Sequence, residues 1–157
     1  MTPAEFIVHT LTERSLTLAC AETLTGGGIA QVLIRVPSSS RALGLGVVAY
    51  SDQAKIEILG VDPETIRRYG AVSEETAREM AESIAAVAHA DLGLAVTGVA
   101  GPGGGSSEKP VGMVCFALKT PGKTVTRTCH FGDLGRDVIM DQSIRTSLEL
   151  VEEYVKQ

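Results

Sequence analysis

The stretch Ala21-Glu22-Thr23-Leu24-Thr25-Gly26-Gly27-Gly28 decides the fold, because an apolar run gives way there to a helical pattern. The run from Leu16 to Cys20 carries no charge and does not alternate, which is typical of a strand buried on both faces. The apolar residues from Ile29 to Val36 recur at helical spacing. A strand, a glycine-rich turn and a helix therefore follow one another, and we call residues 21–28 the glycine corner.

Two hydroxyl side chains, Thr23 and Thr25, lie within the glycine corner. The first N–H groups of a helix have no partner inside that helix, and they favour anions and developing oxyanions. We therefore expect this corner to be the reacting centre, with Thr25, Gly26 and Gly27 among the substrate contacts. A simple turn is the alternative, because the corner contains neither the dinucleotide fingerprint nor the P-loop pattern.

The remaining chain alternates helical and strand patterns and then ends in a hairpin and a helix. We predict helices over residues 2–14, 29–36, 52–59, 63–69, 73–89 and 136–154, and strands over 16–20, 44–50, 90–96, 111–119 and 125–131. This order predicts an α/β fold, a three-layer α/β/α sandwich with a mixed five-stranded sheet. The length suits one domain, residues 1–157.

A second glycine-rich loop, residues 97–105, follows the predicted strand over 90–96. Both glycine-rich segments follow the carboxyl ends of strands, where open α/β sheets bind their ligands. Glycine also lets backbone N–H groups approach a ligand closely. Thr97, Gly98 and Gly101 are therefore candidate substrate contacts, and a surface loop without a ligand is the alternative.

Four further side chains are candidates, each with an ordinary structural alternative. Lys55 follows a strand end and could be a solvated surface group or a catalytic amine, and Lys109 could be a surface group or a phosphate ligand. Tyr50 could lie in the core, at a rim or under an aromatic ring, and Glu22 could orient a lysine or be paired. Residue types alone thus predict an α/β domain with a site for a small ligand.

The composition argues against several classes of protein. A net charge of -5 and an aromatic share of 4% without tryptophan disfavour binding to nucleic acid. The three cysteines lie in apolar runs without paired spacing, and the three histidines are scattered, so we expect neither a disulfide framework nor a metal site. We expect no secretory signal, and no apolar run approaches the roughly 20 residues of a membrane helix.

Seven stretches of the chain carry distinctive motifs, namely residues 21–27, 36–40, 48–55, 59–61, 70–73, 96–104 and 109–112. In this order and spacing they resemble the CinA C-terminal domain family, whose stand-alone members are nicotinamide-nucleotide amidases of the PncC type. The resemblance extends over nearly the whole chain, with the weakest match in the last helix. The resemblance implies a three-layer α/β sandwich, which agrees with the element order. It also implies hydrolysis of the carboxamide of nicotinamide mononucleotide to the nicotinate nucleotide and ammonia, without a cofactor or metal. Family members are cytoplasmic and often homodimers.

The resemblance further implies a serine nucleophile activated by a lysine, and these roles fall on Thr23 and Lys55. Threonine keeps the hydroxyl and serves as a nucleophile in other amidohydrolases, although its methyl group restricts χ1. We expect burial and a neighbouring positive charge to lower the pKa of Lys55, which then accepts the Thr23 proton. The family contacts to the nucleotide would include Tyr50 and Lys109. The alternatives are a non-catalytic nucleotide-binding domain of competence or damage responses, and a hydrolase of another small amide.

Overall fold

The computed structural model describes all residues 1–157 as five strands and six α-helices, with one short 3-10 helix, η1. In chain order they are α1 (Pro3–Glu13), β1 (Leu18–Glu22), α2 (Gly28–Ile34), η1 (Ser39–Arg41), β2 (Leu43–Val48), α3 (Asp52–Glu57), α4 (Pro63–Tyr69), α5 (Glu74–Ala88), β3 (Leu92–Gly98), β4 (Met113–Lys119), β5 (Thr124–His130) and α6 (Arg136–Val155). Every predicted helix and strand is present.

The five strands form one mixed sheet in the order β2-β1-β3-β4-β5. Strand β1 pairs in parallel with β2 and with β3, so the carboxyl ends of these three strands meet at one edge. Strands β4 and β5 form the predicted antiparallel hairpin, and β4 runs antiparallel to β3. The prediction of a mixed five-stranded sheet is therefore confirmed.

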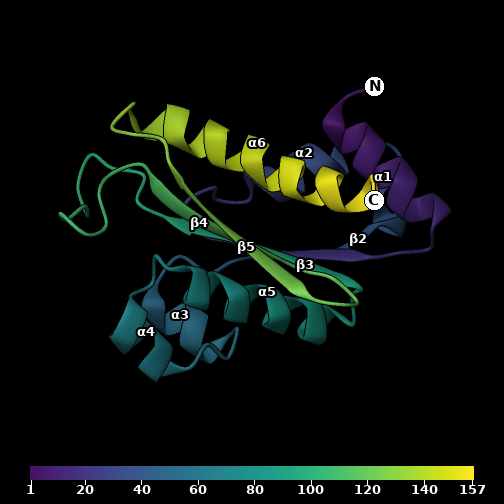
Figure 1. The fold of residues 1–157 in the computed structure, drawn as a ribbon. Coiled ribbons are helices and arrows are strands. Elements are labelled where there is room, and N and C mark those ends of the chain that lie inside the picture. The colour runs from purple at the N-terminus through teal and green to yellow at the C-terminus, as the bar shows by residue number, and fades with distance from the viewer.

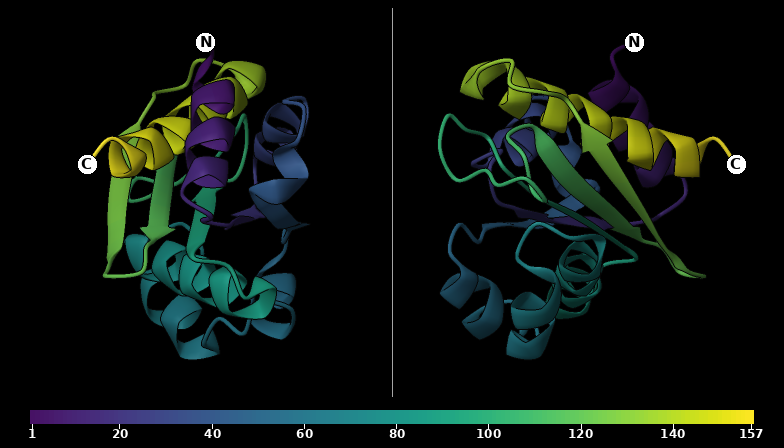
Figure 2. Two further views of the ribbon diagram at one scale, coloured as in Figure 1. Left: turned by 90° about the vertical axis from the view of Figure 1, so that its right-hand side faces the viewer. Right: turned by 60° about the vertical axis from the view of Figure 1, so that its left-hand side comes forward.

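Helices cover both faces of the sheet (Figure 1; Figure 2). Helices α1, α2 and α6 lie on one face, and α3, α4 and α5 lie on the other. The larger apolar core lies on the first face and includes Ile7, Cys20 and Val151, whereas the smaller core lies under α5 and includes Ala21 and Met80. Neighbouring residues of β1 thus enter opposite cores, which confirms the prediction of a strand buried on both faces within a three-layer sandwich.

Side-chain caps explain where several helices begin. Thr2 and Glu5 form a reciprocal capping box at the start of α1. Ser51, Asp62 and Ser73 each accept a hydrogen bond from an N–H group in the first turn of α3, α4 and α5. None of these helices, nor any other in the chain, is both long and apolar enough to cross a bilayer.

Strand β1 lies two residues later in the chain than predicted. Leu16 is not part of the strand, because its N–H group donates to the carbonyl of Leu11 and closes the end of α1. The strand continues through Glu22, a charged residue that the apolar pattern excluded from the prediction. Glu22 is buried at this position because its carboxylate has three hydrogen-bond donors, as described below.

Candidate functional site

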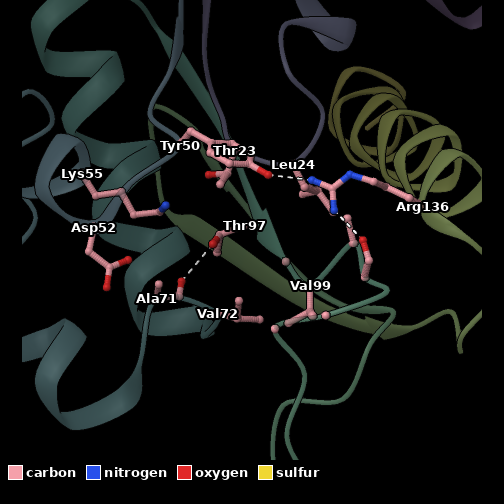
Figure 3. A pocket seen from close by; sticks show the side chains of 15 residues that line it. Thr23, Leu24, Tyr50, Asp52, Lys55, Ala71, Val72, Thr97, Val99 and Arg136 are labelled. Carbon is pink, nitrogen blue, oxygen red and sulfur yellow. Dashed lines mark hydrogen bonds between the residues drawn. The ribbon is translucent and has the colours of Figure 1, made fainter.

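A cavity of about 420 Å³ opens at the edge of the sheet where the parallel strands end (Figure 3). Its walls come from the glycine corner, the start of α3, the segment before α5, the second glycine-rich loop and the start of α6. The lining residues are Thr23, Leu24, Tyr50, Asp52, Lys55, Ala71, Val72, Thr97, Gly98, Val99, Ala100, Gly101, Gly103, Gly104 and Arg136.

Thr23 and Lys55 converge on a single carbonyl group in this cavity. The Thr23 hydroxyl donates to the Ala49 carbonyl oxygen at 3.4 Å, and the Lys55 ammonium nitrogen Nζ donates to the same oxygen at 3.1 Å. Ala49 lies between β2 and α3, so the strand end and the first turn of the helix together aim the amine at the glycine corner. The longer of these two bonds is at the weak end of hydrogen-bond geometry, so the Thr23 hydroxyl is free to exchange its partner.

Lys55 is among the largest fully buried side chains of the molecule, with 2% of its surface exposed. An ammonium group has three donors, and only the bond to Ala49 satisfies one of them. Burial therefore disfavours the charged form and lowers the pKa of Lys55, whereas the negative charge of Asp52 opposes this shift. The predicted contribution from a neighbouring positive charge is wrong, because the nearby charge that acts on Lys55 is negative.

The first N–H groups of α2 do not face the cavity, contrary to the expectation for the glycine corner. The Glu22 carboxylate accepts them from Ile29 at 3.0 Å and from Ala30 at 3.1 Å. The same carboxylate accepts the Thr25 hydroxyl at 2.5 Å. Of its two predicted roles, Glu22 therefore has the paired one and does not orient a lysine. Its negative charge compensates the partial positive charge at the start of α2.

Other backbone donors at the cavity have no partner within the protein. The N–H group of Leu24, directly after Thr23, makes no hydrogen bond to any main-chain or side-chain acceptor. The N–H groups of Ala100 and Gly101 in the second glycine-rich loop are likewise unpaired. These residues line the cavity, so they and not the start of α2 can hold a developing negative charge.

The structure brings some of the other candidate contacts to the cavity and leaves others outside it. Thr97, Gly98 and Gly101 line it, and the Thr97 hydroxyl donates to the Ala71 carbonyl at 2.9 Å. Four candidates are absent from the lining, namely Thr25, Gly26, Gly27 and Lys109. Thr25 is turned towards Glu22, and the side chain of Lys109 lies beside Gly70.

Tyr50 and Arg136 form a rim of the cavity that is joined to the second glycine-rich loop. One nitrogen of the Arg136 guanidinium donates to the Tyr50 hydroxyl at 2.6 Å, and another donates to the Gly101 carbonyl oxygen (Figure 3). Tyr50 is exposed, so it lies at the rim of the cavity, which is one of the three environments predicted for it. Arg136 was not among the predicted site residues, because a lone arginine at a helix start gives no local signal of the cavity.

The sequence profile of the CinA C-terminal domain matches residues 1–155. The chain belongs to the CinA C-terminal domain family. This CinA domain is 44% identical over 152 residues to a protein of Caldanaerobacter subterraneus named for competence-damage induction. It is 43% identical over 147 residues to a CinA-like protein of Kosmotoga olearia. The matches cover 97% and 94% of this chain but only 37% and 35% of the two relatives, so the chain spans little more than a third of their length.

Solved structures of similar proteins have the same fold. The competence/damage inducible protein CihA of Agrobacterium tumefaciens superposes with a TM-score of 0.95 at 40% identity, covering 99% of this chain and 94% of that one. A CinA superfamily protein of Escherichia coli superposes with a TM-score of 0.93 at 34% identity, covering 97% and 88%. The CinA fold therefore accounts for nearly every residue of the chain.

Metal-binding side chains do not gather anywhere in this CinA domain. No group of three or more histidine, cysteine, aspartate or glutamate side chains is placed to hold an ion. The polar groups of the cavity are instead two alcohols, a phenol, an amine, a carboxylate and a guanidinium, together with backbone N–H donors. This set suits a small organic ligand that carries its own charges.

Proposed function

We propose that this domain is an amidohydrolase that converts nicotinamide mononucleotide to nicotinate mononucleotide and ammonia. The observation that carries the proposal is the convergence of Thr23 and Lys55 on the Ala49 carbonyl, with Lys55 buried. An alcohol beside a desolvated amine is the arrangement that activates a hydroxyl nucleophile. Membership of the CinA family supports the assignment, since the family resemblance implies this reaction.

Burial prepares Lys55 to act as the general base. The lowered pKa of its amine increases the neutral fraction near neutral pH, and only the neutral amine can accept a proton. When substrate binds, the Thr23 hydroxyl leaves its weak bond to Ala49 and donates its proton to Lys55. The Thr23 oxygen then attacks the carboxamide carbon and forms a tetrahedral intermediate.

The intermediate collapses when the protonated Lys55 returns its proton to the amide nitrogen. The carbon–nitrogen bond breaks, ammonia leaves and an ester to Thr23 remains. Water then attacks this ester, with Lys55 again as the base, and releases the carboxylate and the free hydroxyl. The unpaired N–H groups of Leu24, Ala100 and Gly101 are the donors that we assign to the oxyanion.

The phosphate of the nucleotide would bind at the rim that carries Arg136, across the cavity from Lys55. Arg136 is the only cation of the lining besides Lys55, and its planar guanidinium suits two-point binding of a phosphate. Tyr50, Thr97 and Gly98 would contact the ribose and ring. A cavity of about 420 Å³ lies within the usual range for small-molecule sites.

An ammonia assay tests the proposal directly. We expect ammonia from nicotinamide mononucleotide with the native chain, equal or greater release with Thr23→Ser, and none with Lys55→Met. Folding of each variant is followed by circular dichroism. Absence of turnover in both the native chain and Thr23→Ser, with both folded, would end the proposal.

A nucleotide-binding domain without catalysis is the second candidate. The threonine at the position of the family serine favours it, because the added methyl group must fit a site shaped for serine. This candidate predicts that the nucleotide raises the melting temperature while no ammonia appears. Turnover by the native chain would exclude it.

A further inference from the structure

The cavity carries its three charged side chains at two separate ends. Asp52 and Lys55 come from the first and last turns of the short helix α3, and Arg136 comes from the start of α6. Figure 3 shows Asp52 and Lys55 on one side and Arg136 on the other, with Thr23 and Thr97 between them. Asp52 is the only acidic residue of the lining.

The Asp52 carboxylate is exposed to solvent in the first turn of α3, where a negative charge suits the helix dipole. It forms neither a hydrogen bond nor an ion pair, whereas the Ser51 side chain caps α3 by accepting the Ala54 N–H group at 3.0 Å. Asp52 is nevertheless close enough to Lys55 for its charge to influence that amine. A carboxylate without a protein partner therefore lies at the end of the cavity where the amide must react.

The charges of the cavity define the ligand that would complement it. When Lys55 is neutral, the Asp52 carboxylate is the negative charge beside the reacting amide. The Arg136 guanidinium is the positive charge at the far rim. Apolar side chains of Val72 and Val99 line the wall between these ends. The complementary ligand is a flat amide-bearing ring with a positive charge, joined to a distant anion.

We propose that Asp52 is a specificity-determining residue that selects amides attached to a positively charged aromatic ring. The proposal rests on the proposed function and deepens it, because the pyridinium ring of nicotinamide mononucleotide is such a cation. Opposite charges a few ångström apart at the mouth of a cavity attract appreciably, although solvent weakens the attraction. A neutral ring of the same shape would lose this attraction.

The test compares two ligands that differ in ring charge alone. One is nicotinamide mononucleotide, and the other is the benzamide C-nucleoside 5′-phosphate, in which carbon replaces the cationic ring nitrogen. The kcat/KM of each is measured with the native chain and with Asp52→Asn. Any effect of Asp52 on Lys55 acts on both ligands equally, so the ratio of the two kcat/KM values isolates the ring charge. We expect Asp52→Asn to reduce the preference for the cationic ring by about fivefold, and less at high salt.

Glu57→Gln is the matched control, because it removes the same charge from an exposed position of α3 outside the cavity. Its preference should equal that of the native chain. An unchanged ratio in Asp52→Asn, with turnover retained, would overturn the Asp52 proposal and leave the amidase proposal standing. If no variant releases ammonia, the dissociation constants of the two ligands replace kcat/KM, and equal loss for both, or binding of neither, overturns the Asp52 proposal.

Discussion

The burial of the Lys55 amine lowers the stability of the fold. The Lys55 stem fills space in the interior, but its amine exchanges hydration for one hydrogen bond to the Ala49 carbonyl. An apolar side chain of similar length would make the same packing contacts without the desolvation cost. Buried ionisable residues that lower the stability of the folded state are typical of functional sites.

Lys55→Met should therefore stabilise the domain by about 1–2 kcal/mol at pH 7. The folded-state pKa of Lys55 lies below its ordinary value of 10.5, so the unfolded chain binds more protons in the interval between these two values. The stability of the native chain consequently rises with pH across that interval, and the advantage of Lys55→Met shrinks as pH approaches 10.5.

Urea denaturation of both chains from pH 6 to pH 10 measures this effect. The exposed Lys123→Met is the control and should change the unfolding midpoint little at any pH. A loss of stability in Lys55→Met at pH 7 would show that the buried amine is stabilising, contrary to the role proposed for it.

Arg136 gives a second prediction at the scale of the residue. If its guanidinium binds the phosphate, Arg136→Ala should lower kcat/KM for nicotinamide mononucleotide by about 10- to 100-fold. Hydrolysis of nicotinamide riboside, which lacks the phosphate, should change little. Arg145→Ala, which removes an exposed arginine of the same helix, is the control. Equal losses on the two substrates would place the phosphate elsewhere.

Some of these residues could be predicted from the sequence and others could not, for physical reasons. Lys55 and Thr23 follow from the order of the motifs, because nothing in a local pattern distinguishes a buried lysine from a solvated one. Arg136 and Asp52 reach the cavity only through the packing of α6 and α3 at the edge of the sheet. The direction of Thr25 depends on the Glu22 carboxylate, whose burial contradicts the usual behaviour of a charged residue.

At the scale of the element, the glycine corner is held by an acid from its own strand. Glu22 joins the end of β1 to the start of α2 through the N–H groups of Ile29 and Ala30 and through the Thr25 hydroxyl. This connection fixes the segment that carries Thr23. The strand, turn and helix were predictable from the apolar runs and the glycines, but the buried carboxylate that joins them was not.

Glu22→Gln should destabilise the domain by about 1–3 kcal/mol, because an amide cannot accept hydrogen bonds at both ends. The midpoint of urea unfolding measures the loss, and the exposed Glu82→Gln on α5 serves as the control. A midpoint equal to that of the native chain would mean that the corner does not depend on this carboxylate.

At the scale of the whole molecule, the three-layer sandwich brings the carboxyl ends of the parallel strands together beside the two glycine-rich segments. The alternation of strand and helix patterns with helix caps was sufficient to predict this architecture, because the order of these elements agrees with the final fold. The homodimer implied by the family stays a prediction, and so does the absence of nucleic-acid partners. The edge of the sheet is the feature from which both proposals follow.

The most direct test of the account is ammonia release from nicotinamide mononucleotide by the native chain, Thr23→Ser and Lys55→Met, measured side by side on folded protein. The account predicts release by the first two and none by Lys55→Met, even though that variant is the more stable protein. Undiminished release of ammonia by Lys55→Met would contradict the account. The absence of ammonia from both the native chain and Thr23→Ser would contradict it as well.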